Sequence, residues 1–213
     1  MILYTVPGSP NSRKVEAVIL HLRLPVEIRH RNLFKGELRS ADYLAINPNA
    51  KAPTLVDGDF KLWESTAIMQ YLAEKSGDTT LFPRNPRTRA DITRWQVWEC
   101  LYFNAALGAL AFETVAKPKY NIGPPDATAV EQAHTTLSRY APVLNGHLEG
   151  RKFLVDDHLT LADYSVATCE PYVSLVPFDF APYSHILAYF DRMRQSEYWA
   201  RARNGAGTTS IAA

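Results

Sequence analysis

A chain of 213 residues with 46% hydrophobic content exceeds one average domain and can bury a substantial core. Its formal charge of +1 gives no reason to expect binding to nucleic acid or to an acidic membrane surface. The two cysteines, Cys100 and Cys169, form no CxxC pair and no disulfide framework, which favours a reducing compartment. Residues 1–6 are too short for a signal peptide, and no stretch reaches the roughly 20 apolar residues that span a bilayer. We therefore expect a soluble, cytoplasmic protein.

The first third of the chain alternates between strand and helix patterns. Its periodicity predicts strands at 2–6, 26–31, 54–56 and 60–63, and helices at 11–22 and 65–75. The first two strands flank a helix, so they should run parallel. Asp57-Gly58 predicts a tight hairpin between the last two strands, and Gly77 is expected just beyond the second helix.

Beyond residue 76 the pattern becomes helical. Helices are expected at 87–115, 128–148, 161–169 and 183–195, with a Pro/Gly loop at 117–126 and a frayed tail at 204–213. Gly108 weakens the first of these helices, and Pro142 should bend or interrupt the second. Thr160 and Asp163 fit a capping box that starts a buried helix. The pattern predicts an α/β domain at 1–76, a linker at 77–86 and an all-helical domain at 87–213.

Ser9-Pro10-Asn11-Ser12 follows the first strand and opens the first helix. Backbone N–H groups at a helix start are unpaired and attract anions. A serine hydroxyl there can donate a hydrogen bond to a thiolate. The same residues also suit a simple helix cap, and the two roles are compatible.

A second group of candidates lies in residues 48–66. A cis bond at Ala52-Pro53 would expose the backbone of Ala52 to an extended peptide, although proline before a strand is more often a turn residue. Lys51 could pair with a carboxylate or be a solvated charge. Glu64 and Ser65 could bind the ammonium and carboxylate of one amino-acid head group, or Ser65 could only cap the following helix. Together these residues suit a small anionic peptide.

The segments 9–15, 47–55 and 62–68 together resemble the cytosolic glutathione transferase superfamily, and the resemblance covers almost the whole chain. It implies a thioredoxin-like N-terminal domain and an all-α C-terminal domain, which together make the glutathione transferase fold. The spacing is most similar to the bacterial nu-like, theta and delta branches, which use Ser or Thr rather than Tyr. Theta-like enzymes carry a histidine after Lys-Gly-Gln, where this chain has Lys35-Gly36-Glu37-Leu38, so the subclass stays open.

The resemblance also implies a role for each candidate residue. Ser9 would be the activating hydroxyl with Asn11 as its neighbour, and whether Ser9, Asn11 or Ser12 contacts the sulfur stays open. The glutathione contacts implied are Lys51 to the glycyl carboxylate, Ala52 to the cysteinyl backbone beside the cis proline Pro53, and Glu64 with Ser65 to the γ-glutamyl end.

Activation of a thiol in such a site is energetically accessible. A free thiol has a pKa of about 8.5, and lowering it by about two units requires about 2.7 kcal/mol of preferential stabilisation of the thiolate. One hydrogen bond to a charged acceptor contributes about 1.5–3 kcal/mol, and a helix start adds about 0.3–1 kcal/mol. A serine hydroxyl at a helix start is therefore sufficient without an acid–base dyad or a metal.

The long helix at 87–115 carries several aromatic residues. Trp95, Trp98 and Tyr102 lie at helical spacing, which indicates a core or dimer contact. In the family this helix also lines the apolar site that binds the second, acceptor substrate. The resemblance therefore makes Tyr102, Phe103 and Phe112 candidate lining residues.

The sequence contains no motif for a metal site, a nucleotide-binding site or a serine-hydrolase site. The six histidines show no HxxxH or HExxH spacing, so we expect no metal. The chain has no GxGxxG motif, no P-loop and no GxSxG elbow.

The leading hypothesis is a glutathione transferase that uses glutathione as co-substrate and acts on a small electrophile. One alternative is a glutathione-dependent peroxidase or disulfide reductase, and another is a non-catalytic relative that binds partners or ligands. A thiol–disulfide oxidoreductase with its own cysteine is disfavoured because the first helix start holds serines. The resemblance implies a homodimer. The second substrate and the physiological role stay open.

Overall fold

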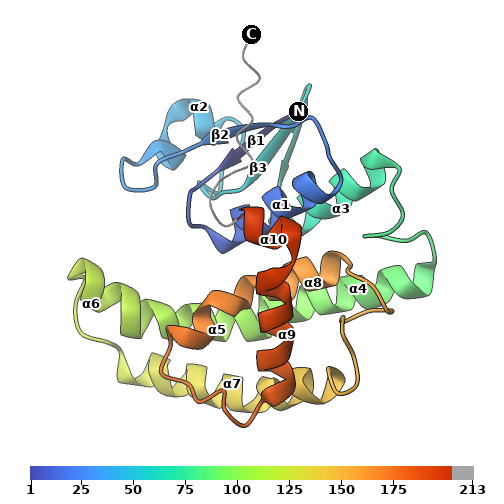
Figure 1. The fold of residues 1–213 in the computed structure, drawn as a ribbon. Coiled ribbons are helices and arrows are strands. Elements are labelled where there is room, and N and C mark those ends of the chain that lie inside the picture. Colours follow the sequence, from blue (N-terminus) through green and yellow to red (C-terminus); the bar gives the residue numbers. More distant parts are fainter. Residues whose placement is uncertain (203–213) are drawn as a thin grey trace. The chain divides into compact units, whose positions relative to one another are not determined.

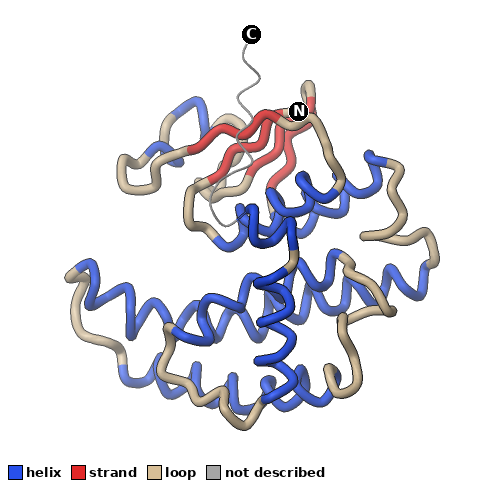
Figure 2. The backbone as a smooth tube through the Cα atoms, viewed as in Figure 1, coloured by secondary structure: helices blue, strands red, loops and turns tan. Residues whose placement is uncertain are grey.

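The computed structural model describes residues 1–202, so the tail expected at 204–213 lies outside the described residues. These residues form two compact units, Met1–Pro83 with the described residues from Gln195 onward, and Arg84–Arg194. Figure 1 follows the chain through both units, and Figure 2 shows that every strand of residues 1–202 belongs to the first. The predicted fold class, an α/β part followed by an all-helical part, is confirmed.

The first unit contains a mixed sheet and its helices. Its elements are β1 (Ile2–Thr5), α1 (Pro10–His21), β2 (Glu27–His30), the 3₁₀ turn η1 (Glu37–Arg39), α2 (Ala41–Leu44), β3 (Thr54–Asp57), β4 (Phe60–Trp63), α3 (Ser65–Ser76) and α10 (Glu197–Ala202). The sequence periodicity did not predict η1, α2 or α10, because each is six residues or shorter.

The sheet has the strand order β2-β1-β3-β4. As predicted, β1 and β2 are parallel, whereas β3 runs antiparallel to both β1 and β4. Asp57 pairs with Phe60 across the hairpin, so Gly58 supplies the positive φ that a two-residue turn needs. Leu3 faces both Ile28 and Leu55 in the register, which places the apolar centre of the sheet on β1.

The core of this unit lies where α1 and α3 pack against each other (Figure 1). Val15 and Val18 from α1 are fully buried, as are Ile68, Met69 and Leu72 from α3. These residues recur at helical spacing, which explains why each helix keeps one face inside. Helix α1 follows β1 after residues 6–9, and α3 follows β4 after Glu64 alone. The polar residues 9–12 and 64–65 lie at the N-termini of these two helices.

Helix α10 packs on α1 within the first unit, although the predicted boundary placed it in the helical domain. The Arg13 guanidinium lies 3.7 Å from the centroid of the Trp199 ring, and its Nη2 donates to the Trp199 carbonyl at 2.8 Å. Trp199 is fully buried. A stacked, hydrogen-bonded arginine of this kind ties the two helices together.

The second unit is helical throughout its described length. Its elements are α4 (Pro86–Trp98), the π-helical turn η2 (Glu99–Phe103), α5 (Asn104–Ala111), the π-helical turn η3 (Phe112–Ala116), α6 (Lys117–Tyr120), α7 (Ala127–His147), α8 (Leu161–Val166), the 3₁₀ segment η4 (Ala167–Ser174) and α9 (Ser184–Gln195).

The long helix differs from its prediction in two respects. The helical run continues through Gly108, and its irregularities are instead the two π turns at Glu99–Phe103 and Phe112–Ala116. The loop predicted from residue 117 is wrong for its first four positions, which form α6. Helix α7 also runs through Pro142 without a break.

The capping box predicted at the start of α8 is confirmed. The fully buried Asp163 carboxylate accepts hydrogen bonds from the backbone N–H of Thr160 at 2.8 Å and of Leu154 at 3.0 Å. The Tyr189 hydroxyl also lies within 3.2 Å. One acidic side chain thereby connects α8, the segment before it and α9.

Candidate active site

Ser9 stands at the N-cap of α1 and keeps a free hydroxyl hydrogen. Its Oγ accepts a hydrogen bond from the Ser12 N–H at 3.3 Å, while Pro10 occupies the first helical position. Among residues 1–202 the Ser9 hydroxyl donates to no acceptor, and the side chain is partly exposed. A hydroxyl has one donor and two acceptor lone pairs, so Ser9 can cap the helix and still donate to a ligand.

Ser12 faces the interior. Its side chain is 1% exposed, and its Oγ accepts from the Val6 N–H at 3.2 Å. This bond fixes the turn between β1 and α1, on which Ser9 lies. Ser12 was a candidate for contact with the sulfur, together with Ser9 and Asn11. The structure differs from that expectation, because the buried Ser12 hydroxyl instead supports the turn.

Asn11 and Ser65 connect the two predicted halves of the site. The Ser65 hydroxyl donates to Asn11 Oδ1 at 3.3 Å. Ser65 is the first residue of α3, and Asn11 lies in the first turn of α1. The starts of two helices therefore adjoin, and an anion there can meet the N–H of Asn11 in α1 and the first N–H groups of α3.

Glu64 has an unusual backbone conformation. It occupies the N-cap of α3 with φ of 70° and ψ of 111°, and its side chain caps nothing. Such a conformation in a non-glycine residue costs about 1–3 kcal/mol and is often found at functional sites. The alternative that Ser65 only caps α3 is wrong, because the N-cap is Glu64 and the Ser65 hydroxyl bonds to Asn11.

The predicted cis bond between Ala52 and Pro53 is present. Just before it, the Lys51 carbonyl accepts hydrogen bonds from the Tyr43 hydroxyl at 2.7 Å and from Asn47 Nδ2 at 2.8 Å. Asn47 Nδ2 also donates to Thr54 Oγ1 at 2.9 Å. Burial raises the pKa of the Tyr43 phenol, so this hydroxyl stays protonated as a donor. The loop is thereby held while the Lys51 side chain is exposed.

The sequence patterns did not predict these hydrogen bonds around the Lys51 carbonyl. Tyr43, Asn47 and Thr54 are buried polar residues, with exposures of 0%, 1% and 0%. Asn47 lies in the segment 47–55, one of those that carry the family resemblance, and this was the one sign in the sequence that it belongs to the site.

The two charged side chains of the candidate site, Lys51 and Glu64, are available to a ligand. Among residues 1–202 the Lys51 ammonium and the Glu64 carboxylate form no hydrogen bond or ion pair. Both residues are exposed. Lys51 precedes the β3–β4 hairpin and Glu64 follows it, so one cation and one anion are available there to bind a ligand.

The three candidate acceptor residues, all in the second unit, differ in exposure. Tyr102 is 40% exposed and stacks on Tyr140, with ring centroids 4.7 Å apart, while Phe112 is 47% exposed. Phe103 is fully buried and stacks on Trp98. The expectation that Phe103 lines an open acceptor site is therefore wrong, because it is a core residue.

Comparison with known proteins decides the family. The sequence matches the family profile "Glutathione S-transferase, N-terminal domain" over residues 3–80 and "Glutathione S-transferase, C-terminal domain" over residues 103–197. The chain belongs to the glutathione S-transferase family. It is 36% identical to "Glutathione S-transferase 3" of Zea mays over 177 residues, which is 82% of this chain and 79% of the relative.

Solved structures of glutathione S-transferases have the same fold. Glutathione transferase F2 from Populus trichocarpa is 27% identical, with a TM-score of 0.84 over 96% of this chain and 99% of that one. Glutathione S-transferase-I bound with lactoylglutathione is 25% identical, with a TM-score of 0.82 over 95% and 97% of the two chains. The predicted glutathione transferase fold is thus confirmed.

Two features are absent from residues 1–202. No group of three or more His, Cys, Asp or Glu side chains is placed there to hold a metal ion. None of the helices in this described part is both long and apolar enough to cross a membrane.

Proposed function

We propose that this glutathione S-transferase activates the thiol of glutathione with the Ser9 hydroxyl. The observation that carries the proposal is the Asn11–Ser65 hydrogen bond, because it joins the two helix starts beside which Ser9 lies. The Ser9 hydroxyl hydrogen and the unpaired Asn11 N–H at the start of α1 both favour negative sulfur over neutral thiol. Ser12 acts indirectly, by holding the turn that carries Ser9.

The remaining candidates bind the peptide part of glutathione in this proposal. The exposed Lys51 ammonium pairs with the glycyl carboxylate, and the backbone of the partly exposed Ala52, before Pro53, pairs with the cysteinyl residue. Glu64 accepts the γ-glutamyl ammonium, while the backbone N–H groups at the start of α3, that of Ser65 included, bind its carboxylate. The opposite charges of Lys51 and Glu64, both without partners in the described chain, support this orientation.

The reaction is a nucleophilic transfer. The glutathione thiol loses its proton to solvent, and its sulfur forms a bond to an electrophilic carbon of the acceptor. The leaving group departs with the electron pair of the bond that breaks, or the electron pair moves into the acceptor in an addition. Tyr102 and Phe112 offer exposed aromatic surface suited to the apolar part of such a substrate.

We further propose that the protein is a Ser-type transferase that acts as a cytoplasmic homodimer. Ser9 at the helix start supports the Ser type, whereas the relatives from Zea mays and Populus are plant proteins and give no support to a bacterial branch. Val97 and Leu101, one turn apart, are 47% and 60% exposed, which suits a contact between subunits.

A titration of the thiolate absorbance of enzyme-bound glutathione tests the central proposal. Ser9→Ala should raise the pKa of the bound thiol by about one to two units, which corresponds to loss of a charge-assisted hydrogen bond. Ser9→Thr retains the hydroxyl and should restore most of the shift. Ser76→Ala is the matched control, since it removes a hydroxyl at the C-terminal end of α3, where Ser76 donates to the Ala73 carbonyl outside the candidate site.

Equal thiol pKa values in the wild-type protein and Ser9→Ala would refute the assignment of Ser9. Assays with chlorodinitrobenzene and with a hydroperoxide separate conjugation from reduction. Glutathione binding without turnover in either assay would favour a non-catalytic binding protein.

A further inference from the structure

Two π turns interrupt the long helix of the second unit. Turn η2 is closed by the Asn104 N–H, which bonds to the Glu99 carbonyl five positions back, and η3 is closed by the Lys117 N–H, which bonds to the Phe112 carbonyl. Turns of this width are rare and often lie at functional sites. The two exposed acceptor candidates, Tyr102 and Phe112, each lie in one of these turns.

A buried glutamate binds the residue that closes η2. The Asn104 side chain donates to Glu99 Oε1 at 2.6 Å, so Glu99 holds Asn104 by both its backbone and its side chain. The Thr168 hydroxyl, from η4, donates to the same oxygen at 2.9 Å. Glu99 and Thr168 are both fully buried. A buried carboxylate costs stability unless its hydrogen bonds are made, so Glu99 favours the turn geometry that makes them.

The same arrangement recurs at η3. Lys117, which closes this turn, places its Nζ 2.6 Å from Glu113 Oε2, and Glu113 is 7% exposed. The Asp126 N–H donates to the same oxygen at 2.6 Å. In both turns a buried glutamate therefore binds the side chain of the closing residue, and in both turns an exposed aromatic residue is present.

The geometry of η2 determines where the Tyr102 ring lies. This ring stacks on Tyr140 of α7, with centroids 4.7 Å apart and ring planes 17° apart, and Tyr102 is 40% exposed. A change from closure over five positions to closure over four shifts the register of the turn by one residue, or about 100° around the helix axis. Such a shift would remove the Tyr102 ring from its place against Tyr140.

We infer that Glu99 is a positioning residue for the acceptor substrate. By binding Asn104 and Thr168 it keeps η2 in its π geometry, which holds the Tyr102 ring against Tyr140 with its exposed part available to the acceptor. The inference rests on the acceptor role of Tyr102 in the proposed function. Glu99 itself is buried and acts only through the turn.

Steady-state kinetics with chlorodinitrobenzene and glutathione varied in turn tests the inference. Glu99→Met removes the carboxylate and should raise the KM for chlorodinitrobenzene about fivefold, while the glutathione KM and the thiol pKa stay unchanged. Glu99→Gln retains an oxygen acceptor for Asn104 and Thr168, so its KM should stay within about twofold of the wild type. A purely structural role would instead reduce the amount of active enzyme, and with it the apparent kcat, at unchanged KM.

A double-mutant cycle with Tyr102→Ala determines whether Glu99 acts through Tyr102. In the Tyr102→Ala background, Glu99→Met should change the chlorodinitrobenzene KM by less than about twofold, because the ring that it positions is absent. The full effect of Glu99→Met in that background would overturn the inference, as would a wild-type KM in Glu99→Met alone. A crystal structure of Glu99→Met should show the Asn104 N–H bonded to the Cys100 carbonyl, and an unchanged π turn would also overturn the inference.

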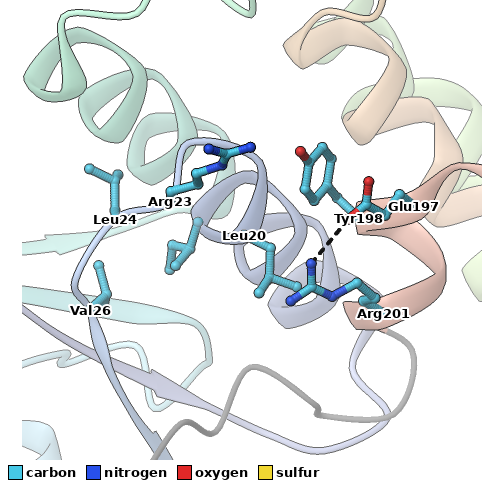
Figure 3. Close-up of a pocket in the computed structure, with 8 residues that line it drawn as sticks. Leu20, Arg23, Leu24, Val26, Glu197, Tyr198 and Arg201 are labelled. Atoms are coloured by element: carbon cyan, nitrogen blue, oxygen red, sulfur yellow. Dashed lines mark hydrogen bonds and ion pairs between the residues drawn. The ribbon is translucent and has the colours of Figure 1, made fainter. Parts of the chain in front are cut away.

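A second variant covers the case in which Glu99→Met does not fold. Asn104→Ala breaks the same hydrogen bond from its other end, at a partly buried residue, and should show the same KM effect and the same coupling to Tyr102. Glu197→Met is the matched control. This exposed glutamate of the first unit pairs with Arg201 at 3.2 Å, beside a hollow at the end of α1 (Figure 3), and its loss should leave both KM values unchanged.

The outcomes separate this inference from the proposed function. A wild-type chlorodinitrobenzene KM in Tyr102→Ala would refute the acceptor role of Tyr102, and the inference with it. A raised KM in Tyr102→Ala without coupling to Glu99 would refute the inference alone. The assignment of Ser9 is judged by the thiol titration, which none of these variants should change.

Discussion

The Ser65 hydroxyl donates a hydrogen bond to Asn11 Oδ1 across 54 positions of sequence. This bond connects the first turn of α1 with the first residue of α3, and the two helices also share a buried core. Each helix start is stabilised by its own sequence, but their adjacency comes from the packing of the helices. An anion placed there meets N–H groups from both helices.

Removal of this bond is expected to weaken glutathione binding while the fold persists. Asn11→Ala and Ser65→Ala should each raise the KM for glutathione several-fold, and the double variant should be less than additive. The coupling expected from one hydrogen bond is about 0.5–1.5 kcal/mol. Steady-state kinetics on the four proteins measures it, and strictly additive effects would show that the bond is not used.

Glu64 should show a trade-off between stability and binding. Glu64→Gly relieves the positive φ of 70° and is expected to stabilise the fold by about 1 kcal/mol, but it removes the proposed partner of the γ-glutamyl ammonium. Glu64→Gln retains the strained backbone and loses only the charge. Thermal melts should separate the two variants, while both should raise the glutathione KM about tenfold. A normal KM in both would remove Glu64 from the site.

Glu16 should make the stability of the fold dependent on pH. This carboxyl is 4% exposed, and burial raises its pKa from 4.5 to about 7, against a hydrogen bond from Thr5 that lowers it. Because the folded pKa lies above the unfolded one, the stabilisation is fully present below about pH 4.5 and is lost as the pH rises through 7. Glu16→Gln should therefore match the wild type at pH 4 and exceed its melting temperature at pH 8.

Glu27→Gln is the control for this pH series. Glu27 is an exposed carboxyl, and its pKa is lowered chiefly by the hydrogen bond from Arg29, so its contribution has the opposite sign. A difference between the Glu16→Gln and wild-type melting temperatures that does not change with pH would contradict the prediction.

Asp163 should be required for the helical unit. Asp163→Ala leaves the N–H groups of Leu154 and Thr160 and the Thr160 hydroxyl without their acceptor. Each unsatisfied buried group costs about 1–3 kcal/mol, so the expected loss is at least about 3 kcal/mol in urea unfolding. Asp163→Asn retains one oxygen acceptor and should lose less. The thiol pKa should be unchanged in any variant that folds.

The sequence was most informative where local chemistry decides the structure. The Asp57-Gly58 hairpin, the start of α1 at Pro10 and the capping box at Thr160 follow from residues close together in the chain. The polar segments around Ser9 and Glu64 were also found, because hydroxyl and acidic residues after a strand mark helix starts.

The parts that were missed depend on contacts between distant residues. Helical periodicity did not predict that Phe103 is buried. The π turn at Glu99–Phe103 changes which residues of the helix face inward. The inward orientation of Ser12 depends on its bond to the Val6 backbone. Asn47 acts through the Lys51 carbonyl, a contact that its own sequence neighbourhood does not specify.

The packing of α10 on α1 has a consequence for biosynthesis. Trp199, which covers Arg13 on α1, emerges from the ribosome only after the whole helical unit has been translated. The α/β unit is therefore discontinuous in the chain and cannot complete its folding during translation of its own first 83 residues. The helix that carries the proposed thiol-activating serine gains this partner only after residues 84–194 have been synthesised.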